Sequence, residues 1–284
     1  MLDPTQSHVR PSGPAPDVLC LHSTATSSRQ WEPLIEHLGP AFRTRAVDLA
    51  GHGERRRVEG LAHSLEREAG SLKAVIDALP GRVHLVGHSY GGAVALRLAR
   101  DIPERIASLA LYEPVMFRLL LDADDPAGKE ALDVANGIRS AAAAGHGLDG
   151  ARIFVDYWSG TGTFAAMREG ARDAVVARLP AVMDCFDALF FDDTTARDLH
   201  RIEVPTLVMT GTASPASGSE ATARVAHAIR GSRWHVFSGL GHMAPITRPQ
   251  AVNAVIGEFL SQPGRMGDRG VVEAANAREA WLVA

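Results

Sequence analysis

Short apolar runs and helically spaced apolar residues alternate along the first part of the chain. Continuous apolar runs bounded by turn residues lie at 17–21, 45–49, 82–86 and 106–112, and they are typical of strands buried on both faces. Between them, apolar residues recur at helical spacing over 30–38, 61–79 and 90–100. This alternation predicts an α/β fold in which helices cover both faces of a mostly parallel sheet.

The alternation stops after residue 114 and resumes at residue 205. Residues 115–200 carry helical periodicity with Gly-rich interruptions at 145–147 and 159–162. Strands are predicted again at 206–210 and 233–237, and helices at 219–229 and 249–260. We therefore expect residues 1–114 and 201–262 to form one α/β core, residues 115–200 a helical insertion, and the polar, Gly-rich residues 263–284 a loosely packed tail.

The composition is that of a folded domain with a large core, since 46% of the 284 residues are hydrophobic. The 29 basic and 33 acidic residues give a net charge of −4, which argues against a nucleic-acid partner. Cys20 and Cys185 lie in apolar runs and are expected to be buried thiols. No apolar stretch is long enough for a membrane helix and no signal peptide is recognisable, so we expect a cytoplasmic protein without membrane contact.

One sequence motif indicates a specific type of chemistry. Residues 87–92 (GHSYGG) form G-x-S-x-G between a predicted strand and a predicted helix, which is the setting that a nucleophilic serine requires. Such a turn is too tight for side chains two residues on either side of the serine, hence Gly87 and Gly91. The turn would hold the Ser89 hydroxyl at the carboxyl end of the strand, beside the amino terminus of the next helix.

The motif in this setting resembles the α/β-hydrolase superfamily, and the resemblance covers residues 17–261. Residues 21–24 (LHST), 48–53 (DLAGHG) and 240–242 (LGH) resemble the family's oxyanion loop, its D-x-x-G-x-G loop and its histidine loop. The resemblance implies Ser89 as nucleophile, His242 as base, an oxyanion hole from the N–H groups of Thr24 and Tyr90, and residues 115–200 as a cap. It also implies a sheet of about six to eight strands, and the short segment before residue 17 favours six.

The acid of the expected triad departs from the family pattern. The family usually carries Gly-x-x-Asp after the strand that follows the cap, but here that position holds Ser214, whose hydroxyl cannot supply a negative charge. Some members place the acid after the neighbouring strand, where this chain has Glu113. We therefore predict Glu113 as the acid. Asp184 or Asp187 of the cap and a Ser-His dyad, with Ser214 orienting the histidine, stay open alternatives.

The remaining residues favour a reaction without metal or cofactor. No H-E-x-x-H, C-x-x-C or P-loop pattern occurs. The predicted cap is rich in aromatic residues and methionine, and Arg118 and Arg152 are the cations that we identify near them; this balance favours an uncharged, partly hydrophobic small-molecule substrate. We expect His22, Ser23, Trp158 and Met243 to contact it.

We interpret the chain as a serine hydrolase that cleaves a carboxylic ester, lactone or thioester through an acyl-enzyme, and as a possible homodimer. The same scaffold also hosts cofactor-free oxygenases, carbon–carbon bond hydrolases and ligand-binding proteins with weak turnover, so these alternatives remain. Acyl length and substrate identity do not follow from the sequence.

Overall fold

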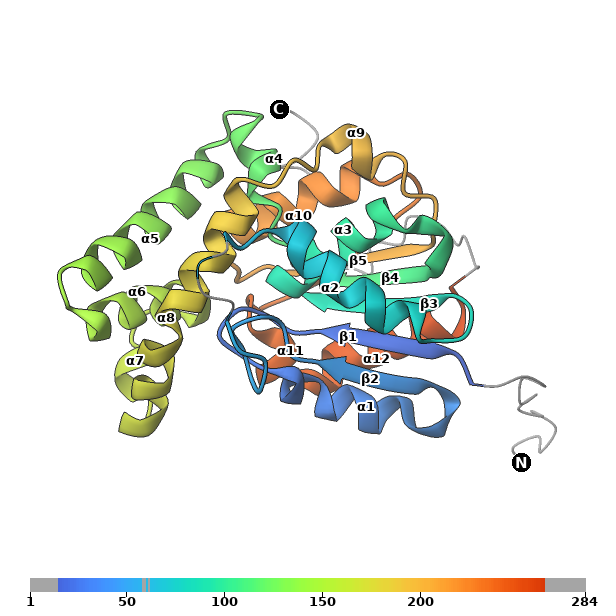
Figure 1. Cartoon of the computed structure of the whole chain (residues 1–284), viewed down its shortest axis with the longest axis horizontal. Coiled ribbons are helices and arrows are strands. Elements are labelled where there is room, and N and C mark those ends of the chain that lie inside the picture. Colours follow the sequence, from blue (N-terminus) through green and yellow to red (C-terminus); the bar gives the residue numbers. More distant parts are fainter. Residues whose placement is uncertain (1–14, 58–59, 61, 264–284) are drawn as a thin grey trace.

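The structure is a computed structural model that describes residues 15–57, 60 and 62–263. Its centre is a six-stranded sheet in which every neighbouring pair is parallel, in the order β2-β1-β3-β4-β5-β6 (Figure 1). The strands are β1 (Asp17–Leu21), β2 (Arg43–Val47), β3 (Val83–His88), β4 (Ile106–Tyr112), β5 (Thr206–Gly211) and β6 (Arg233–Phe237). The predicted α/β class and parallel sheet are confirmed, with six strands.

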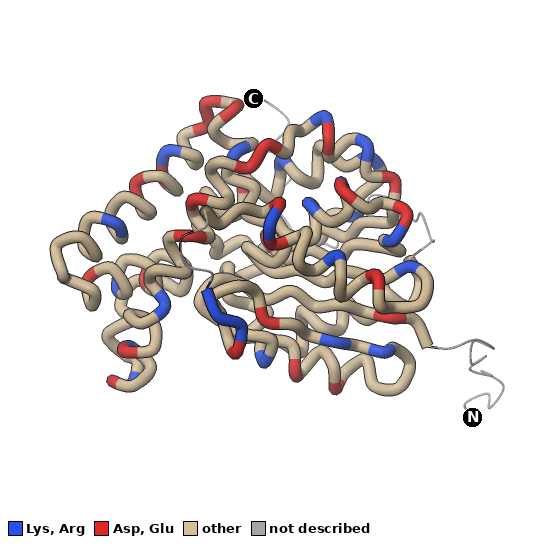
Figure 2. The backbone as a smooth tube through the Cα atoms, viewed as in Figure 1, with Lys and Arg blue, Asp and Glu red and all other residues tan. Residues whose placement is uncertain are grey.

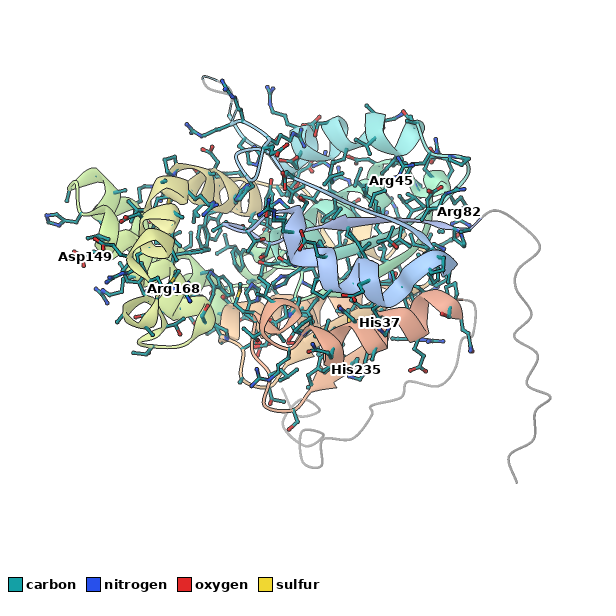
Figure 3. All side chains as sticks on the ribbon, turned by 90° about the horizontal axis from the view of Figure 1, so that it is seen from below. His37, Arg45, Arg82, Asp149, Arg168 and His235 are labelled. Carbon is teal, nitrogen blue, oxygen red and sulfur yellow. The ribbon has the colours of Figure 1, made fainter. Side chains whose placement is uncertain are left out.

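Both faces of the sheet are covered, as the continuous apolar strands require. In β1, Val18 and Cys20 pack with α1 (Glu32–Leu38) and α12 (Pro249–Ser261), which lie side by side on one face (Figure 3). Leu19 and Leu21 point to the other face, where α2 (Leu65–Asp77) and α3 (Tyr90–Asp101) pack. The strands are therefore fixed between two apolar layers.

Two of the predicted boundaries shift because a polar side chain binds the backbone. The strand expected at 45–49 lies at Arg43–Val47. Asp48 leaves the sheet because its carboxylate accepts hydrogen bonds from the N–H groups of Ser28 (2.7 Å) and Glu54 (2.9 Å). The helix expected from residue 61 begins at Leu65, where the Ser64 hydroxyl caps the Arg67 N–H at 3.2 Å.

Helices beyond β4 lie past the carboxyl ends of the strands (Figure 1). They are α4 (Phe117–Leu121), α5 (Pro126–Ala143), α6 (Gly147–Ser159), α7 (Thr163–Ala166) and α8 (Glu169–Phe190). The chain then continues through α9 (Ala196–Leu199), β5, α10 (Ala216–Ala228), β6 and α11 (Ala244–Thr247) before α12. That residues 115–200 behave as a cap separate from the core stays a prediction, which amide exchange tests below.

Basic and acidic positions are interspersed over the helices and loops (Figure 2). Cys20 and Cys185 are both buried free thiols, as predicted. Within the described ranges, no helix is both long and apolar enough to cross a membrane. The tail predicted to pack loosely falls, from residue 264 on, outside the described residues.

Candidate active site

Ser89 lies at a sharp turn between β3 and α3. Its backbone has φ 55° and ψ −120°, a conformation that a residue other than glycine rarely adopts. A Cβ atom at Gly91 would lie 2.3 Å from the Leu21 carbonyl oxygen, and one at Gly87 would lie 2.7 Å from the Gly91 oxygen. Glycine at both positions therefore allows β1, β3 and α3 to approach closely enough to form the turn.

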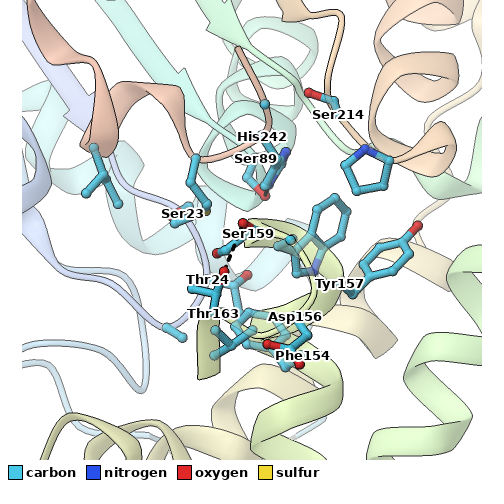
Figure 4. A pocket seen from close by; sticks show the side chains of 18 of the residues that line it. Ser23, Thr24, Ser89, Phe154, Asp156, Tyr157, Ser159, Thr163, Ser214 and His242 are labelled. Carbon is cyan, nitrogen blue, oxygen red and sulfur yellow. Dashed lines mark hydrogen bonds between the residues drawn. The ribbon is translucent and has the colours of Figure 1, made fainter. Parts of the chain in front are cut away.

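The Ser89 hydroxyl faces His242, which follows β6 (Figure 4). Ser89 Oγ lies 3.0 Å from His242 Nε2, and both residues are buried. The loop that carries His242 is held against the end of β4, because the Tyr112 hydroxyl donates a hydrogen bond of 2.9 Å to the Gly241 carbonyl. Gly211 is required there, since a Cβ atom would lie 2.1 Å from the Leu240 oxygen.

Glu113 completes a chain of hydrogen bonds behind His242. Its Oε2 lies 2.6 Å from His242 Nδ1, and the side chain is inaccessible to solvent. The backbone of Glu113 has φ 44°, so the chain turns sharply at the end of β4 and directs the carboxylate toward β5. The structure thus brings the predicted acid within hydrogen-bond reach of the predicted base.

The second carboxylate oxygen of Glu113 accepts three hydrogen bonds. The Thr210 hydroxyl donates at 2.8 Å, the Gly211 N–H at 3.0 Å, and the Ser214 hydroxyl donates as well. Burial alone would raise the pKa of Glu113, but the hydrogen bonds from His242, Ser214 and Gly211 outweigh it and bring the pKa below its ordinary value. The carboxylate is therefore ionised at neutral pH.

An ionised Glu113 decides where the His242 proton lies. A carboxylate only accepts hydrogen bonds, so Nδ1 of His242 carries the proton and donates it to Oε2. Nε2 then has a free lone pair, which accepts the hydrogen bond from the Ser89 hydroxyl. This is the tautomer that a general base for the serine requires.

The alternative acids lie elsewhere. Asp184 forms an ion pair with Arg57, and Asp187 forms one with Arg139 at 2.7 Å. Neither carboxylate has a hydrogen bond to His242 in the described part of the chain, and Ser214 contacts Glu113 rather than the histidine. The geometry therefore favours Glu113 over both alternatives.

Thr24 and Tyr90, whose backbone N–H groups are predicted to form the oxyanion hole, both lie near Ser89. Thr24 lines the cavity beside Ser89, and Tyr90 is the first residue of α3. No acceptor among the described residues binds the N–H of either. The turn that carries Thr24 is held by a hydrogen bond of 3.3 Å from Thr26 N to Ser23 O, and it contains Ala25 at φ 62°. Both groups are thus available for an oxyanion.

A cavity of about 1190 Å³ opens above Ser89, between the ends of the strands and helices α6 and α8. Ser23, Trp158 and Met243 line it, as expected for substrate contacts. Its wall is apolar near α8, and of the described residues that line it none is Lys or Arg. The indole of Trp158 lies against the His242 ring, with 4.1 Å between the ring centroids.

His22 does not line the cavity, contrary to the expectation of substrate contact. It is fully buried beneath the turn that carries Thr24, where its Nε2 accepts the Leu49 N–H at 2.9 Å and its Nδ1 donates to the Ser23 carbonyl at 2.7 Å. Burial lowers the pKa of His22 to about 4, so the ring is neutral at neutral pH. The side chain supports the loop instead of contacting a ligand.

The chain belongs to the α/β hydrolase family, whose model matches residues 18–255. It is 39% identical to a pimeloyl-[acyl-carrier protein] methyl ester esterase of Nitrosomonas europaea, over 37% of this chain and 39% of that protein. The match thus spans about two fifths of that relative. It is 25% identical to a 2-hydroxy-6-oxo-2,4-heptadienoate hydrolase of Pseudomonas putida, over 90% of this chain and 93% of that one.

A solved structure, the enol-lactonase from Burkholderia xenovorans LB400, shares the fold with a TM-score of 0.69. It is 23% identical and covers 88% of this chain and 92% of its own. These relatives are named for different substrates, so the family alone does not select the reaction of this chain.

Proposed function

We propose that this protein is a serine hydrolase that cleaves carboxylic esters, including lactones or thioesters, through an acyl-enzyme. The observation that carries the proposal is the continuous hydrogen-bonded chain of Ser89, His242 and Glu113, with contacts of 3.0 and 2.6 Å. A hydroxyl in contact with an imidazole whose other nitrogen faces a carboxylate is the arrangement of an activated nucleophile.

The steps follow from the geometry. Ser89 Oγ attacks the substrate carbonyl while His242 Nε2 takes the hydroxyl proton, and Glu113 stabilises the imidazolium that forms. The N–H groups of Thr24 and Tyr90 donate to the oxyanion of the tetrahedral intermediate. His242 then protonates the leaving alcohol or thiol, and afterwards it activates the water that releases the acid from Ser89.

The cavity supports an uncharged, partly hydrophobic substrate. Apolar side chains dominate the wall near α8, with Phe186 and Leu189 among them. A carbon–carbon bond hydrolase is the second candidate, because the heptadienoate hydrolase matches almost the whole chain. A dienoate carries a carboxylate, however, and the lining of the described cavity offers it no Lys or Arg, so we favour the neutral ester.

A fluorophosphonate probe and a series of p-nitrophenyl esters of increasing acyl length test the proposal. We expect stoichiometric labelling of Ser89 and burst kinetics with the esters, because an acyl-enzyme accumulates before water attacks. Labelling at any other residue would refute the assignment of Ser89. Absent labelling together with tight binding of an apolar ester would instead identify a ligand-binding protein.

A further inference from the structure

A second chain of hydrogen bonds runs behind the site and joins the two loops that flank Ser89. The Gln30 side chain accepts at Oε1 from the Ser23 N–H (3.1 Å), the Ser23 hydroxyl (3.0 Å) and the Thr26 hydroxyl (3.0 Å). Its Nε2 lies 3.0 Å from His88 Nδ1, and His88 Nε2 lies 2.9 Å from the His242 carbonyl oxygen. The oxyanion loop and the histidine loop are thus connected through two side chains.

The groups at the two ends of this series of hydrogen bonds fix which atom donates in each bond between them. The Ser23 N–H can only donate, so the Gln30 oxygen faces it and the Gln30 NH₂ group faces His88. His88 Nδ1 must then accept, which leaves the ring proton on Nε2. That proton is donated to the His242 carbonyl, which can only accept. One neutral tautomer of His88 satisfies both ends at once.

We infer that Gln30 and His88 are positioning residues that hold the oxyanion loop and the His242 loop in register with Ser89. The inference rests on the proposed function. His88 directly precedes Ser89, so a fixed ring orientation also restrains the turn of the nucleophile. Displacing reacting groups by about 1 Å can cost on the order of 10²-fold in rate, and neither Gln30 nor His88 lines the cavity.

The surroundings of His88 keep this tautomer neutral. The ring is fully buried and lies 5.0 Å from the His242 ring and 5.7 Å from the Tyr112 ring, measured between centroids. Burial, with further contributions from His242 and His22, holds the pKa of His88 well below its ordinary value. A proton on Nδ1 would face the Gln30 NH₂ group, so protonation would break the connection to the oxyanion loop.

Nitrogen-15 NMR of the histidine rings tests the proton positions without any reference to activity. We expect a signal, absent from His88→Asn, with the proton on Nε2 only and with no titration near the ordinary pKa of histidine, because burial holds the pKa of His88 well below that value. In Gln30→Glu a carboxylate oxygen replaces the NH₂ group, so Nδ1 should also gain a proton. Gln250→Glu, at an exposed position of α12, adds the same charge and should leave the signal unchanged. A proton on Nδ1 in the wild type would overturn the inference.

Kinetics separate positioning from a merely structural role. Gln30→Met removes both ends of the connection, and we expect kcat and the rate of fluorophosphonate labelling to fall about tenfold or more, with KM within about twofold. Gln30→Glu keeps the acceptor for Ser23 and Thr26. At pH values where Nδ1 of His88 keeps its added proton, this variant should have most of the wild-type rate, and at higher pH, where that proton is lost, the rate should fall. Unchanged labelling of Gln30→Met would overturn the inference, as would a Gln30→Glu profile identical to that of the wild type.

Failure of the proposed function and failure of the positioning role of Gln30 and His88 would give different results. If wild-type Ser89 does not react with the probe, the proposed function fails, whereas the NMR signal of His88 still decides whether the hydrogen-bonded connection exists. If Gln30→Met does not fold, Gln30→Glu carries the kinetic test, because it preserves the bonds to the oxyanion loop.

Discussion

Replacing Glu113 by glutamine removes one charge and preserves the shape of the side chain. The Thr210 hydroxyl, the Gly211 N–H and the Ser214 hydroxyl all donate to Oε1, so the amide oxygen must take that position. The NH₂ group then lies where Oε2 was, facing Nδ1 of His242. Two donors cannot share that contact, so the His242 proton moves to Nε2, where it faces Ser89 and prevents the ring from acting as base.

The loss of kcat should therefore be about 10²- to 10⁴-fold, toward the upper end because three donors prevent the amide from turning over. This corresponds to about 3 to 5 kcal/mol of transition-state stabilisation. Steady-state hydrolysis of p-nitrophenyl esters measures it, and an unchanged circular dichroism spectrum shows that the fold is retained. Asp184→Asn and Asp187→Asn remove the same charge from solvent-accessible ion pairs and should change kcat by less than about twofold.

A small loss in Glu113→Gln combined with a large loss in Asp184→Asn or Asp187→Asn would refute the reasoning and move the acid to the cap. If all three variants retain most of their activity, His242 works without a carboxylate. Ser214→Ala adds a further test of whether His242 works without a carboxylate. Ser214 donates to Glu113 and does not contact His242 directly, so a large loss in Ser214→Ala alone would not be explained by the contacts in the structure.

Four further outcomes are expected. Ser89→Ala should lose ester turnover by about 10³-fold or more with little change in melting temperature, measured by steady-state kinetics and calorimetry. Ser214→Ala should cost far less than Glu113→Gln, only about 1 kcal/mol or about fivefold in kcat, since two other donors still hold the carboxylate. The pKa of Glu113 is lower in the folded protein than its ordinary value of 4.5, so ionised Glu113 stabilises the fold at pH values above 4.5. As the pH falls below 4.5, the wild type should lose stability relative to Glu113→Gln, measured by urea unfolding. If residues 115–200 form a mobile cap, α5 and α6 should exchange amide protons faster than β1, β3 and β4 in mass-spectrometric exchange, and equal protection would contradict that view.

The fold could be predicted because its strands are buried on both faces and therefore have a simple pattern. In β1 and β3 every residue is buried, so the apolar runs and the strands coincide closely. The strand at 45–49 was misplaced by two residues because the periodicity does not reveal that Asp48 binds backbone N–H groups of two loops. The edge strand β2 is only half-buried, which also weakens its pattern.

The arrangement of the candidate site was predictable where a motif fixes local backbone geometry. Ser89 and His242 follow from short sequence signatures, and Glu113 follows from its place at the end of a strand beside the one that lacks the acid. Gln30 was missed because its partner His88 lies 58 residues away and no local pattern joins them. His22 was placed in the wrong role, because the sequence does not show that both ring nitrogens bind the backbone of neighbouring loops.

Backbone strain concentrates at or beside residues of the proposed catalytic site. Among the described residues other than glycine, four have positive φ, and three of them are Ala25, Ser89 and Glu113. Each such conformation costs on the order of 1 to 3 kcal/mol and persists only where neighbouring contacts enforce it. For Glu113 those contacts are the donors from β5 and the turn after it, together with His242. The hydroxyl of Ser214 has no charge to offer His242, but it is one of three donors that hold the Glu113 carboxylate. If Glu113 is the acid, as we propose, the position from which the usual acid is missing still helps to orient the carboxylate that replaces it.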